Sequence, residues 1–129
     1  MNEYSENSPV VLLVEDEPLV RMAAADDLQD AGFHVLEAAN ADIALAVLES
    51  CSQDVQVLFT DIDMPGSMNG LDLVESVHRR WPHISLLVSS AYHKLCPQQI
   101  PDDGRFVSKP YCSEDVVQHI RQLVDVPVK

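Results

Sequence analysis

Segments of strand-like composition alternate along the chain with segments whose apolar residues return at helical spacing. Val10–Val14 is an unbroken apolar run, which is typical of a parallel strand that is covered on both faces. The predicted strands are Val10–Val14, Phe33–Glu37, Val55–Phe59, Ile84–Val88 and Arg105–Ser108. Because strand and helix alternate along the chain, we predict an α/β fold with a doubly wound, five-stranded parallel sheet and helices on both faces.

The ends of the predicted helices carry residues that favour such positions. Pro18 suits the first turn of a helix, Gly32 suits a C-terminal cap and Ser113 suits an N-terminal cap. Leu19, Val20 and Leu28 are among the apolar residues that keep helical spacing in the first helix. The predicted helices are Pro18–Ala31, a helix that begins at Asn40 or Ala41, Gly70–Trp81 and Ser113–Val124.

The size and charge of the chain exclude several classes of protein. Its 129 residues suffice for one domain, and we expect residues 1–8 to be a flexible tail and residues 9–129 to form that domain. The formal charge of -13 disfavours direct nucleic-acid binding. No apolar run approaches the ~18 residues of a membrane span, and Met1–Pro9 lacks the order of a signal peptide, so we expect a cytoplasmic protein.

The cysteines and histidines give no sign of a metal site of their own. Cys51, Cys96 and Cys112 lie far apart and form no Cys-x-x-Cys pair, so we interpret them as reduced thiols. The five histidines show no ligand spacing with each other or with cysteine, which argues against zinc.

Polar side chains stand where four of the predicted strands end. Glu15 and Asp16 follow the first strand, Asp61 follows the third, Ser89 follows the fourth and Lys109 closes the fifth. The carboxyl ends of parallel strands meet at one edge, where ligands bind in open α/β sheets. In the strand order 2-1-3-4-5, the first and third strands are neighbours, so Asp16 and Asp61 should face each other across a crevice.

This set of side chains suits phosphoryl transfer to a carboxylate. Crowded carboxylates repel one another, and a hard divalent cation such as Mg²⁺ could be held there by one or two carboxylates and a backbone carbonyl. Our working hypothesis is that Asp61 accepts a phosphoryl group, while Lys109 and Ser89 contact the transferring oxygens. We prefer Ser89 to Ser90 because Ser89 immediately follows the apolar strand.

In their order, these motifs resemble the response-regulator receiver domain of two-component and phosphorelay signalling, which has a flavodoxin-like fold. The resemblance runs from about Pro9 to the last predicted helix. The motifs that carry it are Glu15-Asp16, Asp61-Ile62-Asp63-Met64-Pro65-Gly66, Ser89 and Lys109-Pro110.

The resemblance implies a role for each residue of the site. Asp61 would be the phosphoacceptor, and Asp16, Asp61 and the backbone carbonyl of Asp63 would bind Mg²⁺ or Mn²⁺. Glu15 would act on the ion through a water molecule. Two further residues, Ser89 and Phe106, would form a switch, in which the hydroxyl and the aromatic ring move together.

The resemblance also implies partners. A bacterial sensor histidine kinase or a histidine phosphotransfer protein would supply the phosphoryl group, and the chain would catalyse at most its own phosphorylation and dephosphorylation. The chain shows no output domain, so we expect the phosphorylated form to act through a downstream protein or to pass the group onward. No nucleic acid or membrane is expected as a partner, and the protein should be a monomer or a weak dimer.

The sequence departs from the commonest pattern of this family at four places. The loop 65–70 carries one extra residue, Asp63 adds a carboxylate, and Phe106 replaces the more usual tyrosine. The segment Tyr92–Gly104 contains two prolines and is shorter than usual, so any helix in it should be short and mobile.

Two other functions compete with this interpretation. Asp61-Ile62-Asp63 mimics the Asp-x-Asp motif of haloacid-dehalogenase phosphatases, but in those enzymes the motif stands on the first strand and the acidic pair comes late. Met64 also stands where Thr or Val is usual, and the chain has no room for a cap domain. A receiver-like binding module that is never phosphorylated would have no need of Asp16, Asp61 and Lys109 together.

Overall fold

A computed structural model describes residues 8–63, 69–90, 100 and 104–124 of the chain. The strands are β1 (Val10–Val14), β2 (His34–Ala38), β3 (Val57–Asp61), β4 (Ser85–Ser90) and β5 (Arg105–Ser108). The helices are α1 (Pro18–Asp30), α2 (Ala41–Cys51), α3 (Gly70–Arg80) and α4 (Ser113–Val124). All five predicted strands are present. Two of them, β3 and β4, reach two residues further than the apolar runs that predicted them.

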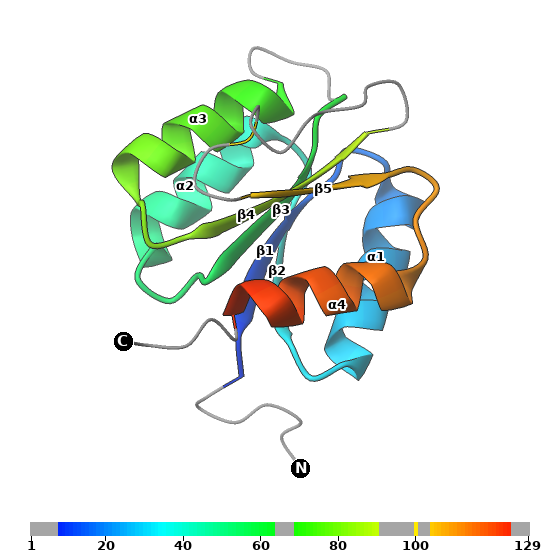
Figure 1. Cartoon of the computed structure of the whole chain (residues 1–129). Coiled ribbons are helices and arrows are strands. Elements are labelled where there is room, and N and C mark those ends of the chain that lie inside the picture. The colour runs from blue at the N-terminus through cyan, green and yellow to red at the C-terminus, as the bar shows by residue number, and fades with distance from the viewer. Residues whose placement is uncertain (1–7, 64–68, 91–99, 101–103, 125–129) are drawn as a thin grey trace.

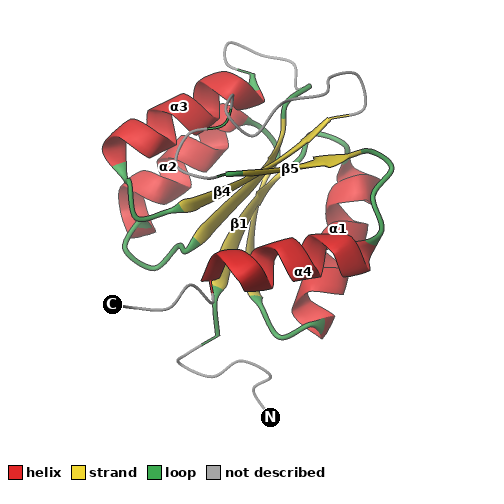
Figure 2. Cartoon of the chain, viewed as in Figure 1, coloured by secondary structure: helices red, strands yellow, loops and turns green. Residues whose placement is uncertain are grey.

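The five strands form one parallel sheet in the order β2-β1-β3-β4-β5. Helices α1 and α4 cover one face and helices α2 and α3 cover the other (Figures 1 and 2). This arrangement confirms the predicted doubly wound fold and strand order. It also places β1 next to β3, as the proposed crevice requires.

Each face of the sheet has its own apolar layer. On the side of α2 and α3, Leu12, Leu58 and Val88 belong to one buried cluster. On the side of α1 and α4, Phe59 and Leu87 belong to the other. Successive side chains of a strand point to opposite faces, so a strand covered on both sides must be apolar throughout. This requirement explains the unbroken apolar runs in the sequence.

Short polar side chains and a glycine define the helix boundaries. The side chain of Asn40 accepts a hydrogen bond from the backbone N–H of Ile43 at 2.8 Å and caps α2, the helix that was predicted to begin at Asn40 or Ala41. Gly32 follows α1 with φ at +98°, a conformation that glycine adopts without a steric penalty, so the predicted cap is confirmed. Ser113 is the first residue of α4 rather than a cap before it, and the carbonyl of Cys112 accepts the first helical hydrogen bonds.

The beginning of α1 does not face the core. Leu28 is buried, but Leu19 is 80% exposed and Val20 is 39% exposed, although the three share helical spacing. Leu19 and Val20 line an open groove of about 540 Å³ whose other wall includes Lys109 and Tyr111. The first turn of α1 therefore borders this groove, and spacing alone does not reveal it.

Several predictions fall on residues outside the described part. These are the tail of residues 1–8, of which only Ser8 is described, the Met64-Pro65-Gly66 motif, the extra residue of the following loop, Cys96 and the short helix between β4 and β5, where the structure describes only Ile100 and Gly104 of residues 91–104. Among the described residues, no helix has the length and apolar character needed to cross a membrane.

Candidate functional site

The predicted acidic residues meet at the carboxyl edge of the sheet. Glu15 and Asp16 follow β1, and Asp61 is the last residue of the neighbouring strand β3. One carboxylate oxygen from each of the three lies within 4.8 Å of the others. Asp16 and Asp61 therefore lie together at this edge, as predicted.

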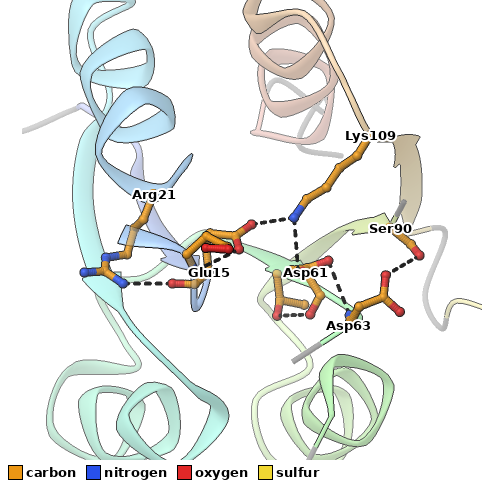
Figure 3. Close-up of polar contacts among 8 residues, drawn as sticks. Glu15, Arg21, Asp61, Asp63, Ser90 and Lys109 are labelled. Carbon is orange, nitrogen blue, oxygen red and sulfur yellow. Dashed lines mark hydrogen bonds and ion pairs between the residues drawn. The ribbon is translucent and has the colours of Figure 1, made fainter. Parts of the chain in front are cut away.

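The side chain of Lys109, which directly follows β5, points into this cluster (Figure 3). Its Nζ lies 2.7 Å from Oε1 of Glu15 and 3.2 Å from Oδ2 of Asp61. The backbone N–H of Lys109 donates to the carbonyl of Ser90 at 2.9 Å, which ties the lysine to the end of β4. The ammonium group of Lys109 thus forms ion pairs with two carboxylates.

Burial makes this cluster electrostatically unfavourable. Asp61 is 4% exposed and Glu15 is 2% exposed. Burial raises the pKa of Asp61, the Lys109 ammonium lowers it, and the carboxylate of Asp63 raises it again. Burial also raises the pKa of Glu15, against the opposing effect of Lys109. For Lys109, burial alone would lower the pKa, but the carboxylates outweigh it and the pKa is raised.

The donor set fits a hard divalent cation. Carboxylate oxygens are the ligands that Mg²⁺ prefers, and two buried carboxylates with a single ammonium leave an excess of negative charge. Asp16 and Asp61 are placed to supply ligand oxygens. Glu15 belongs to the same group of carboxylates and is bound to Lys109.

The loop that carries Glu15 and Asp16 is held by contacts that the sequence did not reveal. Arg21 donates through Nη1 to the backbone carbonyl of Glu15 at 2.9 Å and pairs through Nε with Oε1 of Glu37 at 3.2 Å. The backbone N–H of Glu17 donates to Oε2 of Glu15 at 3.1 Å. Arg21 therefore fixes the acidic loop to β2. The only signal for it in the sequence is a lone basic residue one turn into the helix.

The close approach of α3 to Asp61 could not be predicted from the sequence either. A Cβ on Gly70 would lie 2.1 Å from the backbone oxygen of Asp61 and 2.6 Å from the Cα of Ile62. The backbone N–H of Gly70 also donates to the carbonyl of Ile62 at 3.1 Å. The start of α3 therefore packs on the backbone of the proposed phosphoacceptor, at a position where only glycine fits.

Asp63 connects Asp61 with the end of β4. Its backbone N–H donates to Oδ1 of Asp61 at 3.3 Å. Its own carboxylate oxygen Oδ2 accepts a hydrogen bond of 2.7 Å from Oγ of Ser90 (Figure 3). Asp63 thus contacts the last residue of β3 and the last residue of β4 directly.

Ser89 and Ser90 point to opposite faces of the sheet. Strand β4 continues to Ser90, so side chains still alternate at its end. Ser89 is in register with Asp61 and follows the direction of Leu87, on the side of α1 and α4. Ser90 lies on the other side, where Phe106 packs. The predicted switch residues Ser89 and Phe106 are therefore separated by the sheet, and Ser90 is the serine on the face of Phe106.

Comparisons with known proteins agree with this geometry. A family model described as the response regulator receiver domain matches residues 11–121. The curated protein "Sensor kinase CckA" of Brucella abortus (strain 2308) is 31% identical over 121 residues, which are 92% of this chain and 13% of that protein. The chain also spans only 27% of a matching cyclic di-GMP phosphodiesterase of Thermotoga maritima.

Solved structures share the fold. The receiver domain from the hybrid histidine kinase CckA superposes with a TM-score of 0.78 at 28% identity, over 89% of this chain and 98% of that one. The response regulator protein TrrA from Thermotoga maritima, in complex with Mg²⁺-BeF, superposes with a TM-score of 0.77 at 23% identity, over 89% and 98% of the two chains.

Proposed function

The chain belongs to the response regulator receiver domain family, and from this premise we propose that Asp61 accepts a phosphoryl group from a phosphohistidine in a Mg²⁺-dependent reaction. The observation that carries the proposal is the buried Asp61 carboxylate, which pairs with the Lys109 ammonium at 3.2 Å and lies close to the carboxylates of Glu15 and Asp16. Such a site provides a nucleophile and positive charge for the transferring oxygens.

In this proposal, the metal is held by the side chains of Asp16 and Asp61 and by the backbone carbonyl of Asp63. Glu15 acts on it through a water molecule. The ion supplies positive charge to the phosphoryl oxygens, as Mg²⁺ does in phosphoryl transfer generally. Support comes from the oxygen-rich donor set and its excess of negative charge. The related protein TrrA was crystallised with Mg²⁺ and a beryllium fluoride.

The transfer exchanges one bond to phosphorus for another. An oxygen of the ionised Asp61 carboxylate forms a bond to phosphorus as the P–N bond to the donor imidazole breaks, and the imidazole takes up a proton from solvent. The Lys109 ammonium, 3.2 Å from Asp61, is placed to contact the phosphoryl oxygens and neutralise part of their charge. Later attack by water on phosphorus would restore the carboxylate and release phosphate.

A hydroxyl at the end of β4 completes the proposed site. The sequence assigned this hydrogen-bond donor to Ser89, which the register places directly beside Asp61. This assignment stays a prediction, as does the movement of Phe106. Slower phosphorylation of a Ser89→Ala variant, with unchanged thermal stability, would support it.

The proposed donor is a sensor histidine kinase or a histidine phosphotransfer protein. The proposed output is contact with a downstream protein or onward transfer of the phosphoryl group. Because the chain spans a small part of its curated relatives, these partners are proposed for the receiver domain itself and not for a longer protein. The cytoplasmic location stays a prediction.

The test is direct phosphorylation by a small donor. Purified protein is mixed with Mg²⁺ and acetyl phosphate or phosphoramidate, and intact mass is measured for wild type, Asp61→Asn and Asp26→Asn. Asp26 is an exposed acid of α1 and serves as the control. We expect one added phosphoryl group that depends on Mg²⁺, persists in the control and is absent from Asp61→Asn. An adduct that survives in Asp61→Asn would overturn the proposal, as would wild type that neither forms an adduct nor releases phosphate.

A further inference from the structure

Asp63 forms a bridge between the proposed phosphoacceptor and a buried hydroxyl. It lies two residues beyond the end of β3, its backbone N–H donates to Asp61 at 3.3 Å, and its carboxylate accepts from Ser90 at 2.7 Å. Ser90 is 1% exposed, so this hydrogen bond is shielded from water at the hydroxyl end. Hydrogen bonds to an ionised acceptor are about twice as strong as neutral ones.

We infer that Asp63 is the resting partner of the Ser90 hydroxyl, and that a phosphoryl group on Asp61 competes with Asp63 for it. This inference rests on the proposed function, because it presumes that Asp61 is phosphorylated. It assigns a role to Ser90 and to the carboxylate of Asp63.

The competition follows from the chemistry of a serine hydroxyl. A hydroxyl has one proton to donate, so Ser90 cannot donate to Asp63 and to a phosphoryl oxygen at the same time. A phosphoryl group brings three strong acceptor oxygens and a charge of about -1.5 to -2 near neutral pH. The bond that holds Ser90 in the resting state must break before Ser90 can bind the new group.

Charge biases the exchange in the same direction. The carboxylates of Asp61 and Asp63 already repel each other, which contributes to the raised pKa of Asp61. Phosphorylation increases the negative charge at Asp61 and therefore increases the repulsion on the Asp63 carboxylate. The same added charge attracts the hydroxyl proton of Ser90. The ionised Asp63 carboxylate is therefore destabilised in its resting position, while a competing acceptor for the Ser90 hydroxyl is added beside it.

Ser90 has a neighbour through which its change of partner can be transmitted. It lies on the face of the sheet that Phe106 shares, two residues beyond Val88, which is in register with Phe106. Ser89 lies on the opposite face. A change at Ser90 therefore acts on the layer next to α2 and α3, and a change at Ser89 does not.

The test is a double-mutant cycle on Asp63 and Ser90. Beryllofluoride with Mg²⁺ serves as a non-covalent probe of the phosphoryl site, and its apparent affinity is measured by ¹⁵N–¹H NMR titration. The proteins are wild type, Asp63→Ala, Ser90→Ala and the double variant. Asp63→Asn is added because its amide oxygen still accepts a hydrogen bond but carries no charge.

We expect Asp63→Ala to bind beryllofluoride about tenfold more tightly than wild type, the size of one charge-assisted hydrogen bond. Asp63→Asn should gain less, because the competing acceptor remains. Ser90→Ala should bind more weakly than wild type. In the Ser90→Ala background, the gain from Asp63→Ala should shrink to the part that charge repulsion alone produces.

Two control variants establish whether the coupling is specific to Asp63 and Ser90. Asp26→Ala removes an exposed negative charge from α1 and should leave the affinity unchanged. Ser89→Ala removes the buried neighbouring hydroxyl and should show no coupling with Asp63→Ala. An equal gain from Asp63→Ala with and without Ser90, or coupling to Ser89 in place of Ser90, would overturn the inference.

Different results would contradict the inference and the proposed function. If wild type binds beryllofluoride and is phosphorylated at Asp61, but the cycle shows no coupling, only the role of Asp63 and Ser90 is wrong. If wild type does neither, the proposed function is wrong and the inference falls with it.

Discussion

The interior of the sheet and its carboxyl edge are both buried, but burial has opposite consequences in the two places. In the interior, side chains such as Leu58 and Phe59 are removed from water and each contributes roughly 1.5–3 kcal/mol to stability. At the edge, Glu15 and Asp61 are equally removed from water, and burial raises the pKa of both carboxyl groups. The charged edge is therefore held in place by the apolar interior.

This difference between the apolar interior and the charged edge explains how a reactive site can exist within a stable protein. Two buried carboxylates share one ammonium, so the edge carries negative charge that the resting protein does not balance. That imbalance favours the binding of a cation and disfavours the ionised folded state. Mutations in the interior should therefore reduce stability, and neutral replacements at the edge should increase stability while removing function.

The largest effect should come from the interior. Phe59→Ala should reduce the free energy of unfolding by about 3–5 kcal/mol, because it empties a fully buried site and removes the ring contact with Tyr111. Urea unfolding followed by circular dichroism measures the change. Leu19→Ala, at an 80% exposed position, is the control and should change stability by no more than about 0.5 kcal/mol. Equal losses from the two variants would contradict the contrast between interior and surface.

The next effect should come from the junction of the two regions. Gly70→Ala should cost about 1–3 kcal/mol and slow phosphorylation, because the new Cβ would displace the backbone of Asp61. The control is Gly32→Ala, where a Cβ meets nothing within 4 Å and only the positive φ is strained. Gly32→Ala should lose stability without losing the rate of phosphorylation from acetyl phosphate. Normal phosphorylation of Gly70→Ala would show that the edge tolerates movement at this point.

A change at the edge itself should have the opposite sign. Asp61→Asn should raise the Tm by a few degrees at neutral pH without Mg²⁺, because it removes one of two carboxylates that share Lys109. The folded state raises the pKa of Asp61 above its ordinary value of 3.8, so wild type loses stability as the pH rises through that raised pKa. The gain of the variant should therefore be absent at low pH.

Thermal unfolding at several pH values and Mg²⁺ concentrations measures this gain. Addition of Mg²⁺ should raise the Tm of wild type more than that of Asp61→Asn, so the difference in Tm between the two proteins should become smaller. The exposed-site variant Asp26→Asn is the control for lost negative charge. A lower Tm for Asp61→Asn than for wild type in Mg²⁺-free buffer would show that the carboxylate stabilises the fold.

The smallest effect lies far from the edge, at His119 on α4. Burial, and then the charge of Arg105, lower its pKa below the ordinary value of 6.5. At a pH between the lowered pKa of the folded state and the ordinary pKa of the unfolded chain, the unfolded chain binds more protons. The free energy of unfolding is therefore unaffected by His119 at neutral pH and falls as the pH drops below about 6.5. His119→Gln should flatten this slope in urea unfolding. If the free energy of unfolding of His119→Gln depends on pH as it does in wild type, His119 is not the source of the dependence.

Most of the fold could be predicted from the sequence because each element carries its own signal. Apolar runs marked the strands, and Gly32 and Asn40 marked helix boundaries. The acids of the site were also predictable, since Asp61 stands where a buried strand ends. Arg21 and Gly70 were not, because their roles depend on a backbone carbonyl that becomes their neighbour only after folding.

The sequence by itself determined the alternation of strands and helices, and it placed Asp16, Asp61 and Lys109 at one edge of the sheet. It could do so because polarity changes where a buried strand leaves the core. Only the tertiary structure decided which serine lies on the face of Phe106. The physical reason is the two-residue period of a strand, in which a shift of one position moves a side chain to the opposite face, so the exact end and register of β4 set the direction of Ser89 and Ser90.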